Sequence, residues 1–131
     1  MSENDTPNDP YGFPEDLKRL QARLHRARAE HEALCRTLPW SAEPLPGWAA
    51  KTHPNDSKII VSEGRAPSPG YTPQQHAEDT RLRDLVQELS AEVVTHPFWG
   101  TLAGSDRVAA RVALKTHRDV LATSQPTVEA A

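Results

Sequence analysis

The stretch Thr95–Leu102, THPFWGTL, decides the fold, because it places a proline and two large aromatic residues within eight positions. Pro97 disfavours a helical backbone at His96 and can itself begin a new turn. Since large aromatic side chains are most often packed, Phe98 and Trp99 are expected to fill the space between the helices on either side. We therefore interpret His96–Trp99 as a structural corner rather than a binding site, with Thr95 or His96 as the cap.

Helical patterns lie on both sides of this corner. Thr72, Pro73 and Gln75 form a capping-box start with proline at the first helical position, which predicts a helix over 72–95. A further helix is predicted over 105–121, after a corner segment at 96–104. The residues expected to face the core in these two helices are Leu82, Leu85, Val86, Leu89, Val93, Ala110, Ala113, Leu114, His117, Val120 and Leu121.

A third helix is predicted over 14–38, where apolar residues recur at alternating steps of three and four. Pro14 suits its first turn and Pro39 ends it. This seam favours either a coiled coil with a second copy or a partner, or a long helix packed on the protein's own helices. The first alternative is our leading functional hypothesis, a small non-catalytic interaction or adaptor protein. Its predicted partner-binding residues are Leu17, Leu20, Leu24, His31, Leu34 and Leu38.

Charge differs between the three predicted helices. The helix over 14–38 carries six basic and four acidic residues, that over 72–95 carries two and five, and that over 105–121 carries four and two. An acidic helix can lie between two basic ones, so the pattern predicts that the helix over 72–95 is central, although exposed ion pairs add little stability.

The segment 39–71 is rich in proline and contains Trp40 and Trp48. Only Lys58–Val61, KIIV, resembles a strand, and it has no obvious partner strand. We therefore predict a crossing segment anchored by the two tryptophans. The expected fold class is all-α, with a single helical domain over 14–121, a disordered acidic tail at 1–13 and a disordered tail at 122–131.

Basic side chains favour an alternative function, a small nucleic-acid-associated regulatory protein. A sequence pI near 6.0 weighs against it, because nucleic-acid-binding domains are usually basic. The residues of the two basic stripes are Arg19, Arg23, Arg26, Arg107, Arg111, Lys115 and Arg118.

No pattern for catalysis or for a cofactor is found. The sequence has no glycine-rich phosphate loop, no GxSxG and no HExxH, so we expect no enzyme. His31 and Cys35 share a helix face, but two ligands do not make a zinc site, and we predict neither a metal nor a cofactor. With one cysteine, a polar N-terminal stretch and no long apolar run, the expected location is cytoplasmic, without membrane contact.

Four stretches of the chain resemble small uncharacterised proteins of high-GC actinobacteria. The bias toward arginine over lysine suits such a genome. The resemblance covers residues 38–115 and implies no activity. The stretches are LPW (38–40), SPGYTP (68–73), THPFW (95–99) and AARVALK (109–115).

Overall fold

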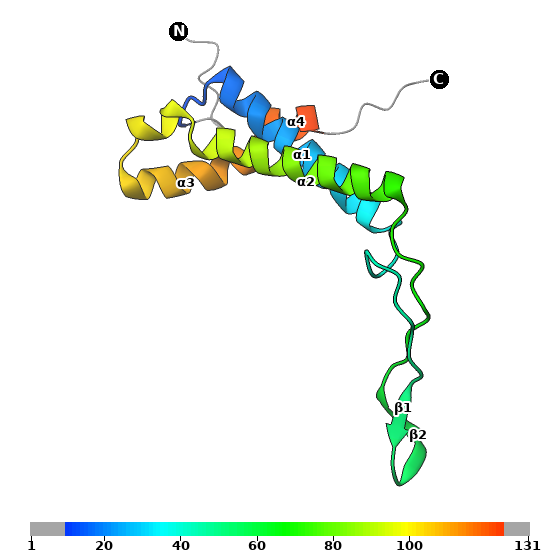
Figure 1. Cartoon of the computed structure of the whole chain (residues 1–131). Coiled ribbons are helices and arrows are strands. Elements are labelled where there is room, and N and C mark those ends of the chain that lie inside the picture. Colours follow the sequence, from blue (N-terminus) through cyan, green and yellow to red (C-terminus); the bar gives the residue numbers. More distant parts are fainter. Residues whose placement is uncertain (1–9, 125–131) are drawn as a thin grey trace. The chain divides into compact units, whose positions relative to one another are not determined.

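The computed structural model describes residues 10–124, which are mostly helical and include one small antiparallel sheet (Figure 1). Residues 1–9 and 125–131 of the two predicted tails lie outside the described residues. In chain order the elements are α1 (Glu15–Cys35), β1 (Lys51–His53), β2 (Asp56–Ser62), α2 (Pro73–Val94), the 3₁₀ helix η1 (Pro97–Thr101), α3 (Gly104–Lys115) and α4 (Arg118–Ser124).

The chain forms two compact units rather than one. Of the described residues, the first unit, here called the helical unit, comprises 10–32 and 81–124, and the second comprises Ala33–Thr80. The second contains the hairpin, which we define as residues 45–68, between the backbone bridge Leu45–Ser68 and the turn that joins β1 to β2.

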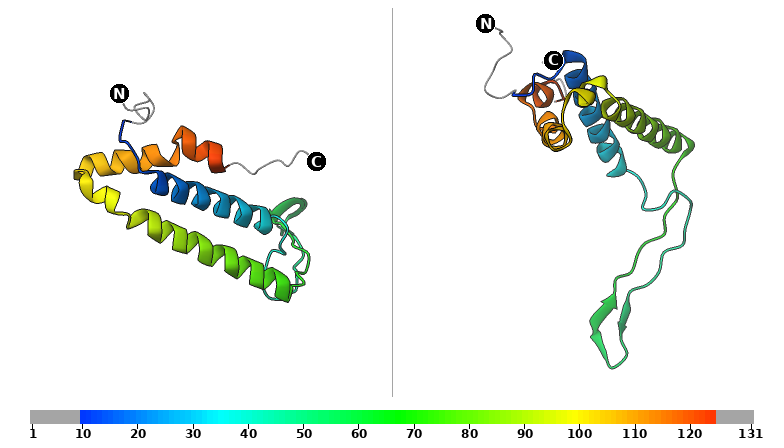
Figure 2. Two further views of the ribbon diagram at one scale, coloured as in Figure 1. Left: turned by 90° about the horizontal axis from the view of Figure 1, so that it is seen from above. Right: turned by 90° about the vertical axis from the view of Figure 1, so that its left-hand side faces the viewer.

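In the helical unit, α1 lies between α2 on one side and α3 with α4 on the other, as both views in Figure 2 show. The prediction that the helix over 72–95 is central is therefore wrong. The order follows the apolar residues rather than the charges, because α1 contributes Leu17, Leu24 and Ala27 to the core and exposed ion pairs are weak.

The core joins α1, α2, η1, α3 and α4 and contains most of the apolar residues expected to face it. Phe13 is also buried and packs against the rings of Phe98, Trp99 and His117. The structure thus differs from the predicted disordered tail at residues 10–13, since burial of an aromatic ring offsets the cost of ordering the chain before α1. Leu82 is buried outside the main cluster, whose buried members are Phe13, Leu17, Ala22, Leu24, Ala27, Leu89, Val93, Trp99, Ala110, Leu114 and Val120.

The start of α2 forms the predicted capping box. The Thr72 hydroxyl accepts a hydrogen bond from the Gln75 backbone N–H at 3.1 Å, and the Gln75 side-chain oxygen accepts one from the Thr72 N–H at 2.8 Å. Both backbone donors lack partners within the helix, so the two bonds fix its first turn. The helix ends at Val94, one residue before the predicted end.

The single helix predicted over 105–121 is two helices, α3 and α4, separated at Thr116 and His117. His117 is 6% exposed, and its Nδ1 accepts a hydrogen bond from the Asp119 backbone N–H at 3.0 Å. The imidazole therefore caps α4, much as a serine or asparagine would. Phe13 contacts the ring of His117, so the same residue connects the break to the core.

Two strands in the second unit correct the all-α prediction. β1 and β2 pair antiparallel, with Thr52 opposite Ile60 and irregular register at both steps between the β1 residues. The sequence signal was weak because β1 has three residues and its pairing is irregular. The strand predicted at Lys58–Val61 is therefore right, and the absence of a partner strand is wrong.

Three Thr-His pairs, at 52–53, 95–96 and 116–117, form the same local structure. In each, the histidine Nδ1 accepts a hydrogen bond from the backbone N–H two residues later, at 3.1, 3.1 and 3.0 Å. The acceptors are His53, which lies at the turn of the hairpin, and His96 and His117, which precede η1 and α4. Each imidazole thus accepts a hydrogen bond from a backbone N–H group at a point where the chain changes direction.

Candidate interaction surface

Trp40 and Trp48 connect the segment that precedes β1 to the segment that follows β2. The rings of Trp40 and Trp48 meet edge to face at 5.5 Å, and the Arg65 guanidinium lies 4.7 Å from the Trp40 ring centre. Trp40 Nε1 donates to the Ala66 carbonyl at 2.9 Å, and Trp48 Nε1 donates to the Glu63 carbonyl at 3.0 Å. The prediction that the two tryptophans anchor a segment crossing the helices is wrong in this respect, because their hydrogen bonds and ring contacts are made within the second unit, to the returning segment.

Backbone pairing continues beyond the strands and needs glycine at two positions. Trp48 and Arg65 exchange two backbone hydrogen bonds of 2.8 Å each. A side chain at Gly47 would overlap the Arg65 carbonyl, and one at Gly64 would lie 2.7 Å from the Ala50 nitrogen. The two backbone segments can therefore approach closely beside the Trp48–Arg65 bridge, because Gly47 and Gly64 lack Cβ atoms.

The hairpin exposes large apolar side chains. The fractions exposed are 50% for Ile59, 55% for Ile60 and 65% for Val61, in the middle of β2. Within the described residues the sheet has two strands, so one edge of β2 has no strand beside it. A strand edge with free backbone donors and acceptors and apolar neighbours is a site where another strand can add. Leu45 and Trp48 are the other exposed large apolar residues of the hairpin.

The structure divides the predicted seam of α1. Leu17 and Leu24 are buried in the core, and Leu20 packs against it. His31 is partly buried near the end of α1. Leu34 and Leu38 are also partly buried, although Leu38 lies beyond the end of the helix at Cys35. The N-terminal half of the seam is thus covered by the protein's own helices.

The structure separates the predicted basic residues by role. Arg107 Nε donates to the Trp99 carbonyl at 3.0 Å and its Nη2 donates to the Leu102 carbonyl at 3.2 Å, so this side chain stabilises the corner. The remaining six predicted basic residues are exposed on three helices. They are Arg19, Arg23 and Arg26 on α1, Arg111 and Lys115 on α3, and Arg118 on α4.

At the corner Trp99 is buried and His96 and Phe98 are partly buried, whereas Pro97 is exposed. Trp99 is 5% exposed, and its Nε1 donates to the Val93 carbonyl at 2.6 Å. His96 is the cap of η1, and its Nε2 lies 3.0 Å from Asp16 Oδ2 on α1. Because Nδ1 of His96 accepts a backbone hydrogen bond, the proton of the neutral ring is on Nε2, which donates to Asp16. The hydrogen bond from His96 lowers the pKa of Asp16 below its ordinary value.

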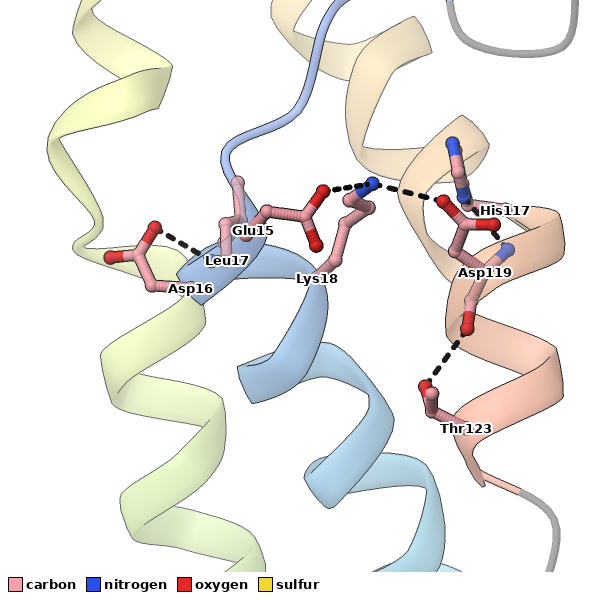
Figure 3. A network of polar contacts seen from close by, with 7 residues as sticks. All are labelled: Glu15, Asp16, Leu17, Lys18, His117, Asp119 and Thr123. Carbon is pink, nitrogen blue, oxygen red and sulfur yellow. Dashed lines mark hydrogen bonds and ion pairs between the residues drawn. The ribbon is translucent and has the colours of Figure 1, made fainter. Parts of the chain in front are cut away.

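A buried lysine joins α1 to α4 (Figure 3). Lys18 is 8% exposed, and its Nζ lies 2.9 Å from Glu15 Oε1 and 3.0 Å from Asp119 Oδ2. Desolvation opposes the charge of Lys18, but the bonds to the two carboxylates outweigh it and raise the pKa of Lys18. The bond from Lys18 in turn lowers the pKa of Asp119.

These carboxylates predict that acid destabilises the helical unit. The pKa of both Asp16 and Asp119 is lower in the folded chain than in the unfolded chain, so the unfolded state binds protons first. Their contribution is complete above the ordinary aspartate pKa and is lost as the pH falls through the folded value. We expect the urea concentration at the midpoint of unfolding to decrease as the pH is lowered below about 4. The decrease should be less steep in Asp119→Asn. Asp84→Asn, an exposed residue of α2, is the control and should keep the full dependence.

None of the helices within residues 10–124 combines the length and apolar character that crossing a bilayer requires. No match was found among curated proteins or among solved structures. A family model described as a domain of unknown function, DUF8825, matches residues 16–117, which include the corner, the hairpin and all of α1, α2 and α3 except Glu15. The chain belongs to the DUF8825 family.

Proposed function

We propose that this protein is a small non-catalytic interaction protein that pairs with a second copy of itself through the open edge of β2. The observation that supports the proposal is the row of exposed apolar residues Ile59, Ile60 and Val61 on a strand with one unpaired edge. Adding a strand there satisfies backbone donors and acceptors and removes apolar surface from water.

A second copy suits this edge because β2 is complementary to itself in one antiparallel register. Where Ile60 lies opposite Ile60 of the other copy, Ile59 lies opposite Val61 on both sides of the two-fold axis. Shifting the pairing by two residues in one direction places Lys58 opposite Ile60, and shifting it in the other places Ile59 opposite Glu63. The first register alone pairs all three apolar residues with apolar residues and opposes no like charges.

The α1 seam and the basic stripes have less support as interaction elements. Two seam residues, Leu17 and Leu24, are at most 4% exposed and would require the core to open before a partner could contact them. The nucleic-acid alternative is weakened because the Arg107 side chain donates hydrogen bonds to two carbonyls of the corner. The other residues of the basic stripes are exposed. We also propose a cytoplasmic location, which fits a chain with a single cysteine.

Covalent trapping tests the register. In a Cys35→Ser background, Ile60→Cys should give a disulfide-linked dimer under mild oxidation, because opposed residues of paired antiparallel strands have Cβ atoms about 5 Å apart. Val112→Cys, at a 61% exposed position of α3, is the matched control. Equal yields of dimer from the two variants would contradict the proposed pairing.

A further inference from the structure

A basic pocket lies in the helical unit, where α1, α2 and α3 meet. Its volume is about 70 Å³. Its apolar wall includes Leu24, Val93 and Leu114, which are at least 96% buried. Because a water molecule needs about 10–15 Å³ of such volume, the pocket has room for several waters or one small oxyanion.

Three cationic side chains line this pocket from two helices. Arg28 comes from α1, and Arg111 and Lys115 come from α3. The pocket-lining residues all lie within 10–124, and none of them is acidic. No ion pair with another described residue neutralises any of the three cations. Like charges that line one pocket repel, so a bound anion would stabilise this arrangement.

Neutral polar groups add to the same pocket. Gln21 is 1% exposed and Ser90 is partly buried, and both line it. The guanidinium and ammonium groups act only as donors, while the amide and hydroxyl groups of Gln21 and Ser90 can also donate. The pocket therefore offers donors and positive charge around a small volume, which is the chemistry that binds oxyanions.

We infer that this pocket binds a phosphate group of a small molecule. Three cations favour a dianion such as phosphate over a singly charged carboxylate, and arginine forks match its oxygens in pairs. Arg111 and Lys115 also belong to the predicted nucleic-acid stripe, but a small pocket lined by residues of three helices suits a small ligand better than a duplex backbone, which needs an extended basic surface. The inference is independent of the pairing of β2.

Titration of the full chain with inorganic phosphate tests the inference. Calorimetry at constant ionic strength, balanced with sodium chloride, should detect phosphate binding that Arg111→Gln and Lys115→Gln each weaken at least about tenfold. Arg19→Gln changes an exposed arginine of α1 that does not line the pocket, and it should bind phosphate within about twofold of the unmodified chain. Acetate should bind more weakly than phosphate.

Three results would overturn the inference. They are the absence of phosphate binding by the folded chain, an equal loss in Arg19→Gln, and salt-sensitive binding of duplex DNA without binding of phosphate. Circular dichroism of each variant shows whether it is folded, and because Arg111 and Lys115 are exposed, we expect both variants to keep the helical signal of the unmodified chain. The double variant Arg28→Gln, Arg111→Gln should then lose phosphate binding altogether.

Discussion

Trp99→Ala is expected to destabilise the helical unit by about 3–5 kcal/mol, which is the usual range for removing a buried aromatic side chain. The indole is 5% exposed, and its centroid lies 5.5 Å from that of the Phe98 ring and 6.4 Å from that of the Phe13 ring. Its Nε1 donates a hydrogen bond to the Val93 carbonyl. The substitution therefore leaves a cavity and removes the shorter of the two hydrogen bonds that the Val93 carbonyl accepts, the other coming from the His96 backbone N–H. Since small domains are stable by about 5–15 kcal/mol, the substitution would remove a large share of the free energy of unfolding.

Urea unfolding followed by circular dichroism measures this effect. Trp48→Ala is the matched control, because Trp48 is 50% exposed and belongs to the other unit. It should leave the unfolding of the helices within about 1 kcal/mol of the unmodified chain. A Trp99→Ala variant as stable as Trp48→Ala would show that the corner does not hold the helices together.

Ile60→Glu is expected to raise the dissociation constant of the proposed dimer at least about a hundredfold. Each of the two chains would lose an apolar contact of about 1.5 kcal/mol, and every 1.4 kcal/mol is a factor of ten. In the proposed register the two new carboxylates would also lie opposite each other at the two-fold axis, which adds repulsion.

Val112→Glu provides the control for this loss. Val112 is 61% exposed on α3, and Ile60 is 55% exposed on β2, so both substitutions place a carboxylate at a similarly exposed apolar position. Val112→Glu should leave association within about twofold of the unmodified chain. If Val112→Glu dissociates the dimer and Ile60→Glu does not, the interface lies on α3 instead of the hairpin.

Local signals in the sequence predicted the helical elements and the corner. The capping box at Thr72 and Gln75 gave the start of α2, and Pro97 beside two aromatic residues gave the corner, because these features act through neighbouring residues. Most of the residues assigned to the core faces of α2, α3 and α4 are buried or partly buried, since helical periodicity reports burial directly. The actinobacterial origin stays a prediction.

Features that depend on distant residues could not be predicted. β1 has three residues, and its pairing with β2 has an irregular register. The sequence of β1 therefore shows no alternation of apolar and polar residues that would predict this pairing. The central position of α1 depends on which apolar faces pack, and charge totals were a poor guide to it. The role of Arg107 depends on two carbonyls of the corner, and Phe13 is buried by contacts with Phe98, Trp99 and His117.

Sedimentation equilibrium of the unmodified full chain tests the proposed pairing most directly. Across about 5 to 500 µM protein, a range suited to small interfaces, we predict a reversible monomer–dimer equilibrium. The dimer fraction should rise with concentration and should be abolished over this range by Ile60→Glu. A mass equal to that of the 14.5 kDa monomer at every concentration would contradict pairing through β2.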